Sequence, residues 1–270
     1  MTARTTSLRA PQAAASGAAR WLSLGVLLAI LMLSSAFAAE KPLEIYLLIG
    51  QSNMAGRAEI TPEIADPLEG VFLLNAEGAW EPAQNPLNRY STIRKSIKMQ
   101  RLGPGYGFAR EMRAQRPDAR IGLVVNARGG SNIDKWAEGT EFFNEAVART
   151  QLALQAGGEL KGILWHQGES DAEDTAYLEK AAALIAALRA ALGNEQLPFV
   201  VGETCAAEET RPVNALLKQI PSTVPRTACV SSQGLTAYDG NTHFDTASQL
   251  ELGQRYATEL LRLLGPAPQH

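Results

Sequence analysis

The stretch LEIYLLIGQSNM, residues Leu43 to Met54, decides the fold of this chain. Its first seven residues are almost continuously apolar, which is typical of a central strand buried on both faces of a parallel sheet. In open α/β sheets, ligands gather beyond the carboxyl ends of the strands. The sequence therefore predicts that the hydroxyl of Ser52 lies at a sheet edge suited to chemistry.

Strand-like and helix-like segments alternate along the chain, which indicates a parallel sheet with helices on both faces. After Leu43–Ile49, the predicted strands are Gly70–Leu74, Arg120–Val125, Gly162–His166, Phe199–Gly202 and Thr227–Ser231. The predicted helices are Gly107–Gln115, Glu141–Gln155, Thr175–Leu192, Pro212–Gln219 and Thr246–Leu264. Asp245 stands at the N-cap position of the last helix. We find no linker or repeat between these segments and expect a single α/β domain over residues 39–270.

Residues 77–102 have few periodic apolar positions. A stretch of this length predicts either a long excursion over the sheet edge near Ser52 or a solvated surface loop.

The first 38 residues have the pattern of a secretory signal peptide. Three arginines precede the apolar run Trp21–Leu33, and Ala36 and Ala38 are small residues at the positions that a signal peptidase reads. At ~13 residues the run is shorter than the ~20 that span a bilayer, although an uncleaved anchor is the alternative. We expect a secreted or periplasmic protein that has no stable membrane association once the signal is cleaved.

Charge and cysteines narrow the possible partners. The formal net charge is −3 and both signs are mixed along the chain, which argues against nucleic acid as a partner.

Cys205 and Cys229 lie in the part expected to be exported, where a disulfide is permitted, and two buried thiols are the alternative. Neither cysteine has metal-ligand spacing to another cysteine or histidine, so we predict no metal site.

A serine hydroxyl is a weak nucleophile and needs a general base within reach. Of the three histidines, His270 ends the chain. His243 lies in a loop of turn-forming residues before the last predicted helix, where it can present both ring nitrogens, and we expect it to be the base. His166 closes a predicted strand and is equally well explained by a structural role.

Four polar segments follow four of the predicted strands. They are GQSN at 50–53, ARGGSN at 127–132, HQGESD at 166–171 and the loop around His243. Their order of nucleophile, glycine, polar amide and histidine resembles that of the SGNH hydrolase superfamily. GQSNM, GGS with Trp136 beyond it, and WHQGESD are most similar to its sialate O-acetylesterase and acetylxylan esterase branch, carbohydrate esterase family six.

The resemblance implies a flavodoxin-like three-layer sandwich with a parallel sheet, the SGNH hydrolase fold. It also implies a secreted serine esterase that removes acetyl groups from a carbohydrate, either acetylxylan or O-acetylated sialic acid, with no cofactor. One alternative is another SGNH enzyme, such as a lipase, thioesterase or arylesterase. A second is a catalytically silent carbohydrate-binding domain. The quoted blocks argue against the first, and the retained serine argues against the second.

In the implied reaction, Ser52 attacks the acetyl carbonyl and His243 accepts its proton. The developing oxyanion needs preorganised donors, each worth ~3 kcal/mol of barrier in comparable sites. We expect these donors to be the backbone N–H groups of Ser52 and of Gly129 or Gly130, together with the side-chain amide of Gln167.

Two carboxylates compete to orient His243. The superfamily usually has an aspartate three positions before the histidine, but here that position is Gly240 and Asp239 lies one residue further away. The resembling branch carries a glutamate in the block that contains Glu169. We therefore favour a role for Glu169 in the site and keep Asp239 as the alternative acid.

Three further side chains have two interpretations each. Arg57 either approaches substrate oxygens or pairs with a nearby acid, and we favour the pairing. Trp136 and Trp165 either stack on a sugar ring or are buried against the sheet.

Overall fold

The computed structural model describes residues 1–3, 41–205 and 212–266. The chain divides into two units, Met1–Glu40 and Lys41–His270. The predicted signal peptide, residues 1–38, lies outside the described residues except for its first three. Over the described part of the chain, no helix has the length and apolar character needed to cross a membrane.

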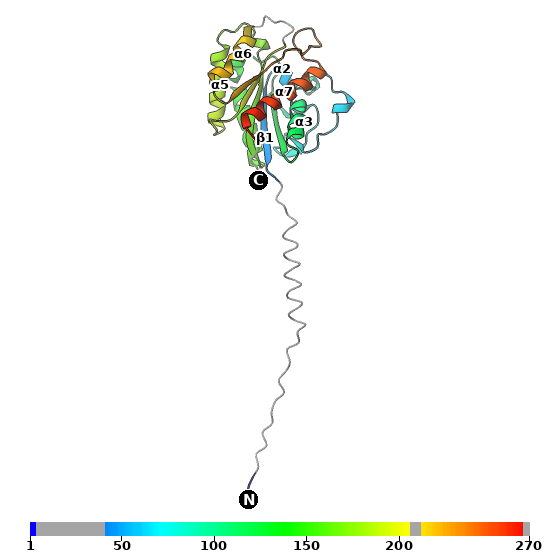
Figure 1. Ribbon diagram of the computed structural model, residues 1–270, viewed down its shortest axis with the longest axis vertical. Coiled ribbons are helices and arrows are strands. Elements are labelled where there is room, and N and C mark those ends of the chain that lie inside the picture. Colours follow the sequence, from blue (N-terminus) through cyan, green and yellow to red (C-terminus); the bar gives the residue numbers. More distant parts are fainter. Residues whose placement is uncertain (4–40, 206–211, 267–270) are drawn as a thin grey trace. The chain divides into compact units, whose positions relative to one another are not determined.

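A seven-stranded sheet forms the centre of the second unit (Figure 1). Every neighbouring pair of strands is parallel except the antiparallel pair β2–β3. β1 lies between β4 and β5, where both of its faces are covered. In spatial order the strands are β3 (Trp80–Pro82), β2 (Val71–Leu74), β4 (Arg120–Ala127), β1 (Leu43–Gly50), β5 (Glu159–His166), β6 (Phe199–Gly202) and β7 (Thr227–Val230).

Helices cover both faces of the sheet (Figure 1). Tyr46 and Leu48 of β1 face one side, and Ile45, Leu47 and Ile49 face the other. The first side packs against α3 (Gly105–Gln115) and α7 (Thr246–Leu264), and the second against α4 (Glu141–Gln155), α5 (Tyr177–Ala191) and α6 (Pro212–Thr223). Because successive side chains of a strand point to opposite faces, one apolar run contributes to two cores. The predicted three-layer α/β sandwich is confirmed.

Short elements connect these layers. α2 (Ser52–Ala55) follows β1 directly, and the described part of the chain has five 3-10 helices in its loops. These are η1 (Pro62–Ile64), η2 (Leu87–Tyr90), η3 (Ile97–Met99), η4 (Ile133–Trp136) and η5 (Glu169–Asp171).

The differences from the predicted elements are local. All six predicted strands are present, and α4 and α7 have the predicted bounds. The sequence pattern missed β3, because three residues ending in a proline carry no strand periodicity. Residues 77–102 hold β3, η2 and η3, and their inner side contacts the end of β4, where the Asn88 side chain donates to the carbonyl of Ala127 over 3.1 Å.

Cys205 and Cys229 are both thiols in the structure, so neither takes part in a disulfide. Cys229 lies on β7. This arrangement corresponds to the alternative of two cysteines with a packing role.

Candidate active site

The turn after β1, residues 50–56 (the serine turn), presents Ser52 at the carboxyl edge of the sheet. Gly50 has φ +136°, and a Cβ at this position would lie 2.1 Å from the carbonyl oxygen of His166. Only glycine therefore allows β1 to turn this close to the end of β5. The N–H of Gln51 donates to that same carbonyl over 2.9 Å. Ser52 then begins α2, with 6% of its surface exposed.

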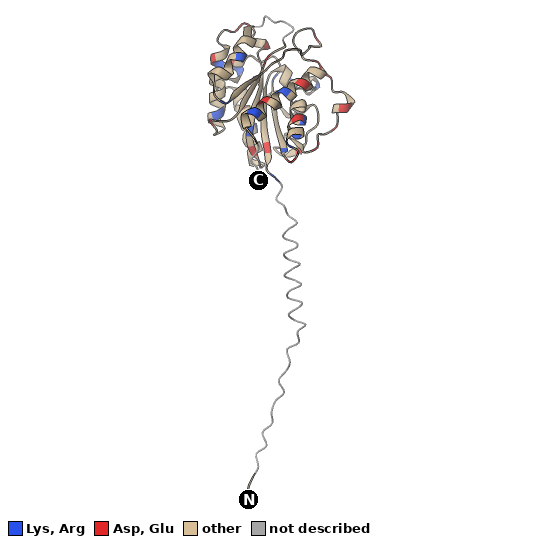
Figure 2. Ribbon diagram, in the orientation of Figure 1, with Lys and Arg blue, Asp and Glu red and all other residues tan. Residues whose placement is uncertain are grey.

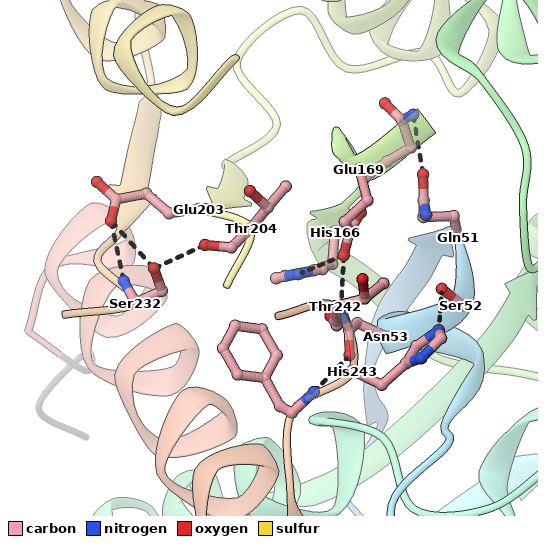
Figure 3. A network of polar contacts seen from close by, with 12 residues as sticks. Gln51, Ser52, Asn53, His166, Glu169, Glu203, Thr204, Ser232, Thr242 and His243 are labelled. Atoms are coloured by element: carbon pink, nitrogen blue, oxygen red, sulfur yellow. Dashed lines mark hydrogen bonds and ion pairs between the residues drawn. The ribbon is translucent and has the colours of Figure 1, made fainter. Parts of the chain in front are cut away.

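The last part of the loop between β7 and α7, residues 237–245 (the histidine loop), carries His243 to Ser52. Nε2 of His243 lies 3.0 Å from Oγ of Ser52 (Figure 3). On the other side of the ring, Nδ1 lies 2.5 Å from Oδ2 of Asp239. The serine, the imidazole and the carboxylate thus form a continuous chain of contacts in the arrangement that nucleophilic serine catalysis needs.

Asp239 also shapes the histidine loop. Its Oδ1 accepts hydrogen bonds from the backbone N–H groups of Thr242, over 3.1 Å, and of His243, over 2.8 Å. Partial burial on its own would raise the pKa of the Asp239 carboxyl. The hydrogen bonds from His243 and Thr242 outweigh this effect and lower that pKa. Asp239 is therefore held in its ionised form.

Glu169, the competing acid, lies away from the His243 ring. Its Oε1 accepts a 2.5 Å hydrogen bond from Nδ2 of Asn53 and lies 3.7 Å from Nε2 of His166 (Figure 3). Of the two carboxylates that the sequence left open, the structure brings Asp239 to His243 and buries Glu169 beneath the serine turn.

His166 belongs to the framework below the site. The Tyr256 hydroxyl donates to the carbonyl of Trp165 over 2.7 Å and lies 3.0 Å from Nδ1 of His166. Because the single hydroxyl hydrogen is used on Trp165, Nδ1 of His166 must be the donor to Tyr256. Burial lowers the pKa of His166, although nearby Glu169 opposes this shift.

Gln167, a predicted oxyanion donor, has its side-chain amide engaged by other acceptors in the structure. Its side-chain NH₂ donates to Oε1 of Gln51 and to the carbonyl of Ser131, each over 3.1 Å, and to Oδ2 of Asp171. The amide is fully buried, and its two hydrogens are shared among these acceptors. In the structure, Gln167 ties together the ends of β1, β4 and β5.

The glycines after β4 lie next to Ser52. A Cβ on Gly129 would be 3.5 Å from Cβ of Ser52 and 2.3 Å from Nη2 of Arg57. Gly130 has φ +71°, a left-handed conformation that favours glycine. A side chain on Gly129 would therefore collide with the Arg57 guanidinium, whereas its contact with Ser52 would be an ordinary van der Waals contact.

Arg57 donates to backbone carbonyls rather than to an acid. Nη1 lies 2.6 Å from the carbonyl oxygen of Gly56 and 3.0 Å from that of Met99. Burial lowers the pKa of the guanidinium. The pairing with an acid that we favoured from the sequence is therefore not what these contacts show.

A cavity of about 490 Å³ lies beside the histidine loop and is lined by Arg57, Glu59, Arg101, Tyr238, Asp245 and Thr246. Tyr238 is 56% exposed, and its ring stacks on that of His243 with centroids 6.1 Å apart and an interplanar angle of 19°. The sequence pattern predicts no role for Tyr238, whose only signal is an aromatic side chain among turn-forming residues.

The two tryptophans are buried against the sheet. Trp136 is fully buried and Trp165 is 1% exposed, and their rings meet edge to face with centroids 5.3 Å apart. Neither is available to stack on a sugar. Among the described residues, no group of three or more His, Cys, Asp or Glu side chains is arranged to hold a metal ion.

Comparisons with known proteins show the family of this chain. A family model described as "Carbohydrate esterase, sialic acid-specific acetylesterase" matches residues 42–262. A probable carbohydrate esterase of Arabidopsis thaliana is 32% identical over 241 residues, which cover 82% of this chain and 91% of the relative.

Two solved structures have a fold similar to that of this chain. An X-ray structure of a protein from Arabidopsis thaliana is similar with a TM-score of 0.74 and 30% identity, covering 82% of this chain and 99% of that one. NanS has a TM-score of 0.65 at 18% identity, covering 82% and 98%. Since one family model spans most of this chain, the protein belongs to the carbohydrate esterase family of sialic acid-specific acetylesterases and is an ester hydrolase.

Proposed function

We propose that this protein hydrolyses O-acetyl esters on a carbohydrate, with Ser52 as nucleophile, His243 as general base and Asp239 as the orienting acid. The 3.0 Å contact between Nε2 of His243 and Oγ of Ser52 carries the proposal. The family supports the ester and carbohydrate part of it. The residue roles follow from the geometry of the three side chains.

The reaction begins when Oγ of Ser52 bonds to the acetyl carbon and its proton passes to Nε2 of His243. The carbonyl oxygen becomes an oxyanion, for which the backbone N–H groups of Ser52 and of Gly129 or Gly130 are the proposed donors. Because Ser52 opens α2, its N–H has no acceptor within the helix. Asp239 stabilises the imidazolium that forms.

The tetrahedral intermediate then collapses. The bond between the acyl carbon and the sugar oxygen breaks, and the proton on His243 passes to that oxygen. Water attacks the acetyl-enzyme while His243 takes one of its protons, and release of acetate returns the proton to Ser52. No cofactor enters this sequence of steps.

The sugar occupies the cavity between Arg57, Arg101 and Tyr238 in this proposal. Arg57 lies both at this cavity and against Gly129, so a substrate that reaches Ser52 from the cavity passes its guanidinium. The exposed Tyr238 ring offers a flat apolar surface for a sugar face.

Acetate release from acetylated xylan, from O-acetylated sialic acid and from an aryl acetate tests the function, with Ser52→Ala as the matched variant. We expect wild-type release from at least one sugar ester and a loss of about 10⁴-fold or more in the variant, because the nucleophile is gone. The variant should keep the wild-type melting temperature. Equal release by both proteins would show that another residue is the nucleophile.

A further inference from the structure

The side chain of Asn53, the residue after Ser52, is fully buried and uses all its hydrogen-bonding positions. Nδ2 donates to Oε1 of Glu169 over 2.5 Å and to the carbonyl of Thr242 over 2.9 Å. Oδ1 accepts from the N–H of Phe244 over 3.2 Å and from Nε2 of Gln249 over 3.1 Å. Figure 3 shows Asn53 between Glu169 and the histidine loop.

Two of these contacts lie on either side of His243, since Thr242 precedes it and Phe244 follows it. Asn53 therefore hydrogen-bonds to the backbone on both sides of the residue that carries the imidazole. It does so from the serine turn, one residue away from the hydroxyl that the imidazole must reach.

The hydrogen bonds of Asp239 and Tyr238 act within the histidine loop, and those of Asp245 join its end to Thr236 and to α7. Asp239 accepts from the N–H groups of Thr242 and His243, and the N–H of Tyr238 donates to the carbonyl of His243 over 3.0 Å. These bonds determine the shape of the loop and the direction of the His243 ring. None of these bonds reaches the serine turn, whereas the Asn53 contacts join that turn to the loop.

Glu169 sets the orientation of the Asn53 amide. Its oxygen accepts from Nδ2, so the NH₂ group faces Glu169 and the amide oxygen is turned towards the N–H of Phe244. The Glu169 side chain is only 3% exposed, which keeps this contact out of water. Glu169 thus acts on His243 through Asn53.

We propose that Asn53 is a positioning residue for the reaction: its amide, oriented by Glu169, holds the peptide groups on both sides of His243 and sets the distance from Nε2 to Ser52. This inference rests on the proposed serine esterase function. Asp239 orients the ring, and Asn53 places the loop that carries it.

Aryl acetate hydrolysis by Asn53→Ala is the first test, because this substrate makes no sugar contacts. We expect kcat to fall by about a hundredfold, the effect of a displacement of about 1 Å in a catalytic group. KM should stay within about twofold and the acidic limb of the pH profile should not move, because the Asp239–His243 contact lies within the loop. Asp239→Asn, by contrast, should alter that limb.

Asn214→Ala is the matched control. The Asn214 amide on α6 bonds the N–H, hydroxyl and carbonyl of Thr204, so the control loses a comparable set of contacts that involve neither Ser52 nor His243. We expect its kcat within about twofold of wild type. Equal losses in Asn53→Ala and Asn214→Ala would show that Asn53 is merely structural and would overturn the proposal.

Labelling with a fluorophosphonate, which reacts with an activated serine, separates positioning from unfolding. We expect Asn53→Ala to reach one label per molecule, as wild type does, but about a hundredfold more slowly. Wild-type protein that takes no label would mean that the proposed function itself has failed. Labelling of wild type and variant at the same rate would overturn only the role of Asn53.

Two variants of Glu169 decide the matter even if Asn53→Ala does not fold. Glu169→Gln keeps an oxygen that can accept from Asn53, so its kcat should stay within about tenfold of wild type, whereas Glu169→Ala should fall about a hundredfold. Equal losses in the two variants would show that Glu169 acts by its charge rather than through Asn53. Wild-type kcat in Glu169→Ala would overturn the proposal as well.

Discussion

Asp239 and Glu169 show at the residue scale how position decides what a carboxylate does. Asp239 is four residues before His243, and one of its oxygens accepts two N–H groups of the loop while the other meets the ring. This loop accommodates one more residue than the usual spacing, with Gly240 at φ +95°. Glu169 lies below, where it meets Asn53 and His166 instead.

Asp239→Asn should lower kcat by about a thousandfold or more, because an amide can stabilise the wrong tautomer of His243 and cannot stabilise the imidazolium. The pKa of Asp239 is lowered, so its contribution is present above the ordinary carboxyl value of about 3.9 and is lost only as pH falls through its lower folded value. The carboxylate therefore stays ionised between pH 5 and pH 9. Measurement of kcat on aryl acetate tests this, and a loss below about tenfold would assign the supporting role elsewhere.

His166→Asn should reduce the acid sensitivity of folding. Burial lowers the pKa of His166 in the folded protein. Below the ordinary histidine pKa of about 6.5, the unfolded chain therefore binds a proton at this residue more readily than the folded protein does. Wild-type stability is thus expected to decline as pH falls from about 7.5 to 5.5. Urea unfolding at these two pH values should show a smaller decline in the variant, and an equal decline would contradict the assignment.

At the element scale, α7 links the histidine loop to the core. Its buried face, with Leu252, Tyr256 and Leu260, packs on the sheet, and Tyr256 reaches His166 beneath the site. Its N-cap is Asp245, whose Oδ1 accepts from the N–H of Ser248 over 2.8 Å, as the sequence predicted. The end of the loop is therefore determined by the start of the helix.

Asp245→Ala should destabilise the protein by about 1 kcal/mol, the usual cost of losing an N-cap. Asp245→Ser keeps an acceptor for the Ser248 N–H and should recover most of this loss. Urea denaturation of the two variants and wild type measures the difference. Equal stability of Asp245→Ala and wild type would mean that the cap contributes nothing to folding.

At the scale of the whole molecule, the parallel sheet brings distant segments together at one edge. Ser52 follows β1, Gly129 follows β4, and the histidine loop lies between β7 and α7. A second cavity, of about 600 Å³, lies at the opposite end of β1 and is lined by Leu43, Glu44 and Arg116 among others. Although it is larger, no serine or histidine lines it.

Figure 2 shows basic and acidic residues interspersed over the visible helices.

Export is the prediction that concerns the chain as a whole. Expression of the full chain in a bacterial host should give a periplasmic or extracellular protein whose first residue is Ala39, because residues 1–38 have a signal peptide pattern. Cell fractionation and sequencing of the amino terminus measure this. Full-length protein in the membrane fraction would favour the uncleaved anchor.

The sequence by itself determined the central strand, the layered α/β fold, the serine at the sheet edge and the histidine that meets it. It could do so because apolar periodicity and turn-forming residues are local patterns, which can be read from the sequence without knowing the distances between atoms. The tertiary structure alone decided that Asp239 rather than Glu169 contacts His243. It also decided that the Gln167 amide donates to neighbouring acceptors, and that Asn53 hydrogen-bonds to the histidine loop. These contacts join residues as far as 191 positions apart, and which of several polar atoms meet depends on angstrom-scale placement that no local pattern encodes.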